Sequence, residues 1–147
     1  MKVKVLSLTG PMKINVRPLD WEQDYSELKQ QLDLYFSKVE VRKVLHNIGD
    51  PVCVQWRGQW FRAVLLGVLP PDKSLVRLVD NGQVLEVARE QVRDCPLELL
   101  KMPARSFSCH LDGVMFGDDL IKDDKLLDIV SALPESRVIC FLCLQGY

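Results

Sequence analysis

The sequence predicts a mainly β protein with two helices, in which a small antiparallel barrel is inserted into a second lobe. Residues 49–93 contain short alternating apolar runs, and Gly, Pro, Asn and Asp separate them as in small closed barrels. Residues 24–38 repeat apolar side chains at helical spacing, and strand-like runs recur on both sides of the barrel. Because no Gly/Ser-rich linker divides the sequence, we expect the two flanks to fold together across the insertion.

The barrel is expected to contain four strands and a short closing segment. The strands are predicted at residues 52–56, 60–65, 74–79 and 84–87, and the closing segment at residues 91–93. Tight turns are predicted at Arg57-Gly58-Gln59, Pro70-Pro71-Asp72-Lys73 and Asp80-Asn81-Gly82.

The N-terminal flank is predicted to contain a β-hairpin followed by a helix. The two strands of the hairpin span residues 3–8 and 12–16, on either side of Gly10-Pro11. Asp24 is expected to begin the helix, because Glu27 stands three residues later in the capping-box position. The helix should continue to about Lys38 and bury one apolar face, which consists of Tyr25, Leu28, Leu32, Tyr35, Phe36 and Val39.

The C-terminal flank is predicted to contain a connector, two strands and the second helix. The connector spans residues 97–102, between Pro96 and Pro103, and a strand follows at residues 106–111. An amphipathic helix is expected to begin near Asp118 or Asp123, and a final strand is expected at residues 137–144.

Composition favours one globular unit and argues against several classes of partner. A chain of 147 residues with 48% hydrophobic and 27% charged residues can bury a core and is not typical of a disordered segment. The net charge is −1, and Lys and Arg are scattered along the chain. A nucleic-acid-binding protein normally carries a basic stripe, so nucleic acid is not expected as a direct partner.

Cellular location is inferred from hydropathy and cysteine usage. The longest apolar runs are about 5–7 residues, far short of the ~20 that a membrane helix needs, and the N-terminus lacks the apolar region of a signal peptide. Most of the five cysteines lie in apolar runs, which suits buried thiols in a reducing compartment. We therefore expect a cytoplasmic or nuclear protein without a membrane partner.

Known catalytic and metal-binding patterns are absent from the sequence. Neither G-x-S-x-G nor H-E-x-x-H occurs, so we expect no enzyme and assign no catalytic residue, cofactor or metal. Cys140 and Cys143 form a C-x-x-C, but on a strand these positions point to opposite faces and cannot share one metal. The acidic pairs at residues 118–119 and 123–124 favour helix capping over calcium binding.

The motifs of the barrel resemble those of the Tudor domain. The matching runs are Gly49-Asp50, Trp56, Trp60-Phe61-Arg62-Ala63 and Leu78-Val79-Asp80-Asn81-Gly82-Gln83. The order hairpin, helix, barrel, strand, helix, strand is similar to that of the extended Tudor module, and residues 103–114 resemble its re-entry strand. This resemblance implies a Tudor β-barrel core inserted into a split OB-like lobe related to staphylococcal nuclease.

The resemblance also implies a division of the chain into three segments. Residues 1–45 would form the N-terminal part of the nuclease-like lobe with the linking helix, residues 46–95 the Tudor core, and residues 96–147 the C-terminal part of the lobe. Because the sequence stops at Gly146-Tyr147 without a polar tail, we expect it to be a piece of a longer protein.

The ligand site implied by the resemblance is an incomplete aromatic cage. Tudor domains surround a methylated arginine or lysine with aromatic rings, which attract the cation. Trp56 and Phe61 would keep two walls of the cage and line a partly exposed surface. Leu78 and Asn81 stand where two other aromatic residues are expected, and Gln83 replaces the usual Asn. Asp80 offers a carboxylate nearby, so all six residues are candidates for ligand binding: Trp56, Phe61, Leu78, Asp80, Asn81 and Gln83.

Three functions remain open from the sequence and the resemblance. The first is a non-catalytic interaction module of a germline Tudor protein in the piRNA pathway, located in the cytoplasm at perinuclear germ granules (nuage). It would bind the arginine-rich N-terminal segment of a Piwi-clade Argonaute without requiring methylation, with other germ-granule proteins as further partners. The second is a methylarginine or methyl-lysine reader of histone tails. The third is a structural or self-association module with a vestigial pocket.

Overall fold

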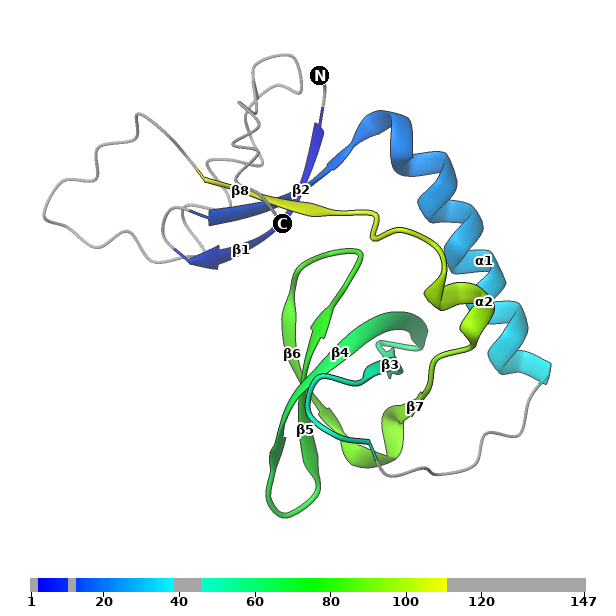
Figure 1. The fold of residues 1–147 in the computed structure, drawn as a ribbon, viewed down its shortest axis with the longest axis vertical. Coiled ribbons are helices and arrows are strands. Elements are labelled where there is room, and N and C mark those ends of the chain that lie inside the picture. The colour runs from blue at the N-terminus through cyan, green and yellow to red at the C-terminus, as the bar shows by residue number, and fades with distance from the viewer. Residues whose placement is uncertain (1–2, 11–12, 39–45, 111–147) are drawn as a thin grey trace, which may run out of the picture.

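The fold consists of two antiparallel β-sheets and a long helix that runs beside both of them (Figure 1). The computed structural model describes residues 3–10, 13–38 and 46–110. The helix predicted near Asp118 or Asp123, the strand predicted at residues 137–144, and Cys140 and Cys143 lie outside these ranges. The mainly β architecture predicted from the sequence is confirmed.

The smaller sheet joins the two flanks of the barrel. It contains β1 (Val3–Gly10), β2 (Lys13–Pro18) and β8 (Phe107–His110), in the order β1-β2-β8. Strand β2 pairs with β8 from Lys13 opposite His110 to Val16 opposite Phe107, so segments on either side of the barrel share one ladder. Its buried apolar residues are Val3, Ile14, Val16 and Cys109. The expectation that the flanks fold together is confirmed.

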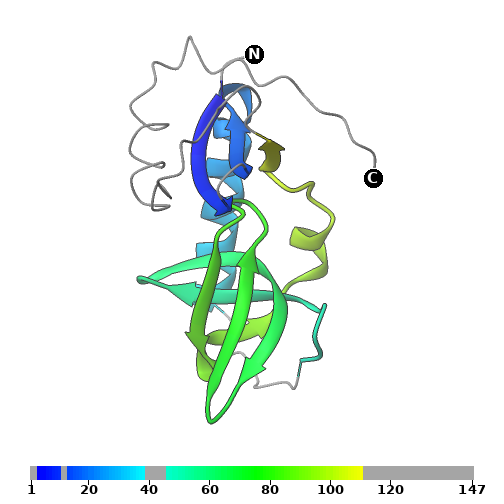
Figure 2. The same cartoon turned by 90° about the vertical axis from the view of Figure 1, so that its left-hand side faces the viewer.

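The larger sheet is the barrel, which forms the lower part of the molecule in Figure 2. Its strands are β3 (Pro51–Trp56), β4 (Gln59–Leu69), β5 (Lys73–Leu78), β6 (Val84–Ala88) and β7 (Val92–Asp94), in the order β6-β5-β4-β3-β7. A 3-10 turn at Arg89–Gln91 leads into β7. Strand β4 ends at Leu69 rather than at the predicted residue 65, because a bulge between Leu65 and Gly67 lets it continue along β5.

Alternation along the barrel strands places one set of side chains inside. The enclosed cluster consists of Val52, Val54, Phe61, Ala63, Leu65, Val76, Leu78, Val87 and Val92. The β3–β4 turn is tight, since Trp56 pairs directly with Gln59. The two residues between them, Arg57 and Gly58, both have positive φ, which matches the twist that a two-residue hairpin requires.

Helix α1 (Glu22–Lys38) links the two sheets after a 3-10 turn at Leu19–Trp21. It begins two residues before the predicted Asp24, whose carboxylate lies 3.4 Å from the guanidinium of Arg105. Leu28 and Leu32 are buried in a cluster with Cys53 of β3 and with Leu99. Leu99 belongs to the short helix α2 (Leu97–Leu100), which occupies part of the predicted connector. Of the described helices, none is long and apolar enough to cross a membrane.

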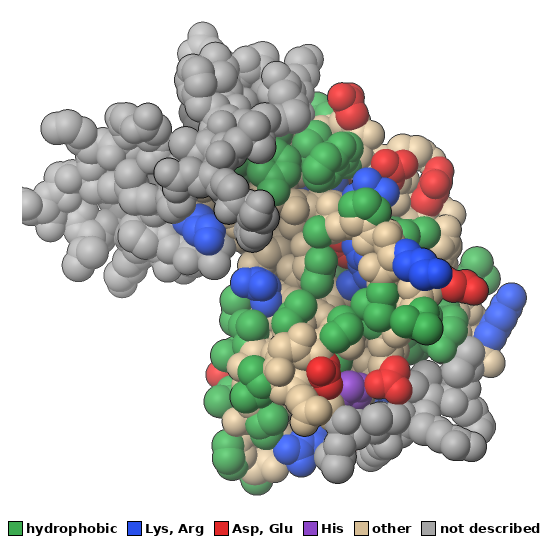
Figure 3. Space-filling model, viewed as in Figure 1, with side chains coloured by type: hydrophobic (Ala, Val, Ile, Leu, Met, Phe, Trp, Pro, Cys, Tyr) green, Lys and Arg blue, Asp and Glu red, His purple; other side chains and the backbone are tan. Residues whose placement is uncertain are grey.

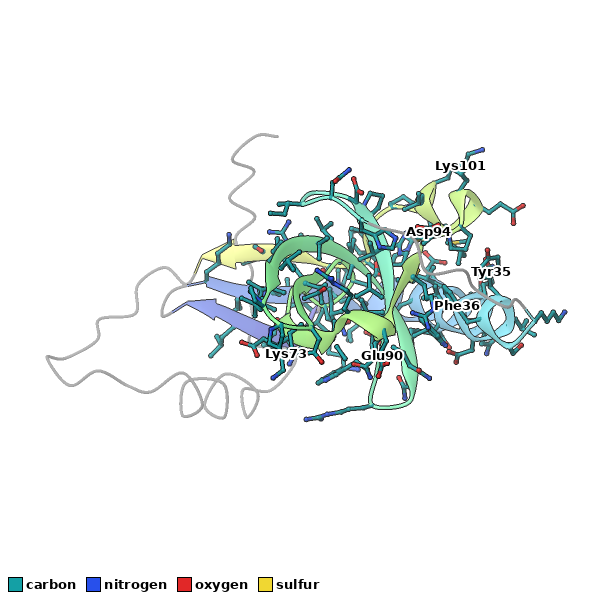
Figure 4. All side chains as sticks on the ribbon, turned by 90° about the horizontal axis from the view of Figure 1, so that it is seen from below. Tyr35, Phe36, Lys73, Glu90, Asp94 and Lys101 are labelled. Atoms are coloured by element: carbon teal, nitrogen blue, oxygen red, sulfur yellow. The ribbon has the colours of Figure 1, made fainter. Side chains whose placement is uncertain are left out.

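The apolar face predicted for α1 is correct for most, but not all, of its residues. The ring of Phe36 stacks on that of Trp60 with centroids 3.9 Å apart, and Figure 4 shows Phe36 on the barrel side of the helix. Tyr35 was predicted to face inward, but it is 37% exposed, and its ring lies edge-on against that of Phe36 with centroids 5.0 Å apart. Val39 lies outside the described residues.

Candidate ligand-binding site at the aromatic pair

Trp56 and Phe61 meet where β3 turns into β4, and we call these two rings the aromatic pair. Their centroids are 5.9 Å apart and their planes are inclined at 60°. Trp56 is half-buried, whereas Phe61 is 8% exposed and belongs to the enclosed cluster of the barrel. Of the two residues predicted to line a partly exposed surface, Trp56 is therefore the more accessible, and Phe61 is part of the barrel core.

Two positively charged side chains of the protein itself lie over the aromatic pair. The ammonium Nζ of Lys29 is 3.6 Å from the centroid of Phe61, and the guanidinium carbon of Arg57 is 4.4 Å from that of Trp56. Lys29 also donates a hydrogen bond to the carbonyl of Trp60. Burial lowers the pKa of Lys29, while the nearby carboxylates of Asp33 and Asp80 oppose this shift.

Sequence reasoning did not assign either cation to the site. For Lys29 a signal was present, because it precedes Leu32 by three positions and Phe36 by seven, which places all three on one side of α1. For Arg57 the signal was its place in the two-residue turn directly after Trp56. Each ring of the aromatic pair thus carries a cation of the protein itself.

Leu78 stands at one of the missing cage positions and is part of the barrel core. Its side chain is 1% exposed, in the same cluster as Phe61 and half-buried Trp56. Leu78 and Gln83 close the turn after β5, since the Leu78 N–H donates to the Gln83 carbonyl at 2.8 Å. The Gln83 side chain is half-buried. Leu78 therefore contributes to the interior of the barrel and not to an exposed surface.

Asp80 has a structural role in place of the ligand-binding role predicted for it. Its two carboxylate oxygens accept hydrogen bonds from Arg62, at 2.9 Å from Nε and 2.6 Å from Nη2, and the Arg105 backbone N–H donates to it at 2.9 Å. Asp80 is 4% exposed. A buried carboxylate that is already bound to a guanidinium is not available to a ligand.

The Arg62 guanidinium also binds backbone carbonyls of the segment that follows the barrel. Nη1 donates to the carbonyls of Leu99 and Met102, both at 2.7 Å, and Nη2 also donates to that of Pro103 at 3.1 Å. Arg62 therefore fixes the segment that leads from α2 toward β8. This role of the Arg in the Trp-Phe-Arg-Ala run was not foreseen from the sequence.

Asn81, which was also predicted to contact a ligand, instead forms hydrogen bonds with two residues of the smaller sheet. Its backbone carbonyl accepts a hydrogen bond from the Ser7 hydroxyl at 2.8 Å, and its side-chain oxygen accepts one from Arg17 at 3.0 Å. The Arg17 guanidinium, whose side chain is 1% exposed, lies 3.5 Å from the centroid of the Tyr25 ring. Asn81 thus holds the barrel against the lobe, where the sequence had predicted a ligand contact.

Basic and acidic side chains are interspersed on the face shown in Figure 3, so this face carries no large patch of one charge.

No cluster of three or more potential metal ligands occurs within the described ranges. Cys53 and Cys95 are thiols rather than half-cystines. A hydrogen bond between Cys53 and Cys95, together with burial, raises the pKa of Cys53.

A protein-family model described as the Tudor domain matches residues 1–113. The chain belongs to the Tudor domain family. Tudor domain-containing protein 1 of Danio rerio is 35% identical over 105 residues, which make up 68% of this chain and 9% of that protein. Protein tudor of Drosophila melanogaster is 25% identical over 137 residues, 93% of this chain and 5% of that protein. The chain thus spans less than a tenth of the length of these relatives.

Solved extended Tudor domains share the fold of this Tudor domain. One is extended Tudor domain TD3 of mouse TDRD1 in complex with a MILI peptide containing dimethylarginine, with a TM-score of 0.78 and 24% identity over 90% of this chain and 71% of that chain. Another is the Drosophila melanogaster Papi domain with a dimethylated Piwi N-terminal peptide, with a TM-score of 0.78 and 17% identity over 87% of this chain and 68% of that one. The extended Tudor fold implied by the sequence is confirmed.

Proposed function

We propose that this Tudor domain is a non-catalytic module that binds an arginine-containing peptide at the aromatic pair without requiring methylation of the arginine. The observation that carries this proposal is that both rings already hold cations, and that the one on Trp56 is the unmethylated guanidinium of Arg57, 4.4 Å from the ring centroid. A guanidinium stacks on an aromatic face through its charge and its plane, and neither needs methyl groups.

The replaced cage positions support the same conclusion about methylation. Leu78 is an aliphatic part of the core, and the side chain of Asn81 is bound to Arg17. Each missing aromatic face lowers the attraction for a cation by about 0.5–2 kcal/mol, depending on desolvation. An unmodified guanidinium keeps all five N–H donors, whereas methylation blocks some of them and leaves the charge unchanged. With Trp56, Phe61 and Gln83 as the ligand contacts, the dimethylated form gains little.

The natural ligand that we propose is the arginine-rich N-terminal segment of a Piwi-clade Argonaute. The fold is shared with solved domains whose partners are a MILI peptide and a Piwi N-terminal peptide. On this proposal the parent protein acts in the piRNA pathway, in the cytoplasm at perinuclear germ granules. The chain spans less than a tenth of the length of these relatives, so we propose both the pathway and the location of the whole protein.

Calorimetric titration with matched peptides tests this function. One peptide carries an unmodified arginine, the second a symmetric dimethylarginine and the third a lysine at the same position. We expect the first two to bind with similar, roughly micromolar affinity, about −8 kcal/mol. Trp56→Ala should weaken binding of both by about threefold or more, because one aromatic face is lost.

The matched control is Tyr35→Ala, which removes an exposed aromatic ring from α1 and should leave the affinity unchanged. A clear preference for dimethylarginine would refute the proposed independence from methylation. Equal affinities of wild-type protein and Trp56→Ala would move the site away from the aromatic pair, and preferential binding of methylated histone-tail peptides would favour a chromatin reader.

A further inference from the structure

The position of Lys29 on Phe61 has a consequence for any ligand of the aromatic pair. Phe61 is 8% exposed and belongs to the enclosed barrel cluster, so little of its ring is accessible to a charged group. The Lys29 ammonium already lies over one face of the ring, 3.6 Å from its centroid. A second cation cannot share this face at contact distance, because two like charges in a partly buried site repel each other.

Lys29 is also held more firmly than the cation on the neighbouring ring. It is half-buried on α1, and its ammonium donates to the Trp60 carbonyl as well as contacting Phe61. The stacked rings of Phe36 and Trp60 fix the adjacent turn of the helix against the same hairpin. Arg57, by contrast, is exposed in the turn and can leave Trp56 for water.

We propose that Lys29 is an internal competitor, a cation of the protein that covers Phe61 and must be displaced before a ligand arginine can use both rings. This inference rests on the proposed function, and it assigns to α1 an influence on affinity that the barrel residues alone do not account for. Trp56 is then the ring first available to a ligand, and Lys29 sets how much affinity the second ring adds.

A ligand-free measurement tests the position of Lys29 independently of any peptide. The ring current of Phe61 should shift the NMR signals of the Lys29 ε-methylene protons to lower frequency than those of the other lysines. Phe61→Leu should abolish this displacement, and the unfolded protein should not show it. Random-coil shifts for Lys29 in the folded wild-type protein would overturn the inference directly.

Titration of the unmodified arginine peptide tests the competition itself. Lys29→Ala should bind the peptide roughly threefold or more tightly than the wild-type protein does, since the peptide no longer displaces an ammonium. Lys29→Arg keeps a cation over the ring and should bind like the wild type. Alanine is favourable inside a helix, so Lys29→Ala should fold, and its thermal unfolding verifies this.

The control for net charge is Lys73→Ala, because a positively charged peptide is attracted more strongly when any lysine is removed. Lys73 is exposed at the start of β5, and Figure 4 shows it across the barrel from α1. An equal gain in Lys73→Ala and Lys29→Ala would overturn the competition, and so would weaker binding by Lys29→Ala. Binding by none of these proteins would refute the proposed function, and the competition with it, while the NMR result would still report where Lys29 lies.

Discussion

Arg17 and Arg62 illustrate how buried charge is accommodated at the residue scale. Arg62 uses all five of its N–H donors, on the Asp80 carboxylate and on three carbonyls, one within α2 and two after it. Arg17 donates to the carbonyls of Asp80 and Arg105 and to the carboxylate of Glu22 at 3.0 Å. Removing any one of these partners would be destabilising, because it would leave a buried charge or polar group unsatisfied.

Tyr25, which lies against the Arg17 guanidinium, gives the protein a measurable pH dependence. Burial raises the pKa of Tyr25 above its ordinary value of 10.0, and Arg17 only partly offsets this. Above about pH 10 the unfolded chain therefore loses a proton that the folded protein keeps, and the free energy of unfolding falls as the pH rises. In Tyr25→Phe the free energy of unfolding should fall less over this pH range, because the ionisable hydroxyl is absent. Urea unfolding between pH 8 and about pH 11 measures it.

The control for this prediction is Tyr35→Phe, since Tyr35 is an exposed tyrosine of the same helix. Identical profiles for Tyr25→Phe and the wild type would contradict the prediction, because all other titrating groups are common to both proteins.

At the scale of single elements, α1 has two separate roles that fall on neighbouring parts of its surface. Leu28 and Leu32 anchor the helix against Cys53 and Leu99, which ties it to both β3 and α2. Lys29 and Phe36 reach the β3–β4 hairpin instead. The helix thus connects the packing of the interior with the aromatic pair.

Leu32→Asp should destabilise the protein severely. Leu32 is fully buried, so the new carboxylate would have to be desolvated without a partner, which costs several kcal/mol. Leu34→Asp is the matched control, because Leu34 is 56% exposed two positions further along α1. Thermal unfolding should show a large loss for the first variant and little change for the second. A Leu32→Asp protein as stable as Leu34→Asp would contradict the packing of α1.

At the scale of the whole molecule, the barrel and the smaller sheet meet at the turn of residues 79–82. Ser7, Asn15 and Ser108 form a chain of hydrogen bonds on the smaller sheet that ends on the Asn81 carbonyl. Gly82 lies directly against this chain, and a Cβ placed on it would be 2.2 Å from Cγ of Asn15. The interface therefore requires a glycine at this position for space as well as for backbone conformation.

Gly82→Ala should cost more stability than Gly58→Ala. Both glycines have φ of +74, so both variants strain the backbone by roughly 1–2 kcal/mol, but a Cβ on Gly58 would meet no atom within 4 Å. The additional loss in Gly82→Ala measures the close approach of the two sheets. Chemical unfolding of both variants gives the comparison. Equal losses of unfolding free energy in the two variants would contradict a tight contact between Gly82 and Asn15.

The sequence predicted the fold well and the candidate site only in part. The barrel strands and α1 could be predicted, because turn residues and apolar periodicity are local properties of the chain. The roles of Asp80 and Asn81 could not, since Arg62 and Arg17, which bind them, come from distant segments that no periodic pattern links to them. Lys29 was missed for a related reason: a lysine on a helix is ordinarily a solvated residue, and only packing against Phe61 gives it another role.

The ladder between β2 and β8 can close only after the barrel has been synthesised. When the ribosome has produced β1 and β2, the second partner of β2 does not yet exist, because residues 107–110 are synthesised after the whole barrel. Closing that ladder through an unfolded intervening segment carries an entropy cost that grows with the length of the loop. A folded barrel brings the two ends of this segment closer together, so a barrel that folds first lowers the entropy cost of completing the surrounding lobe.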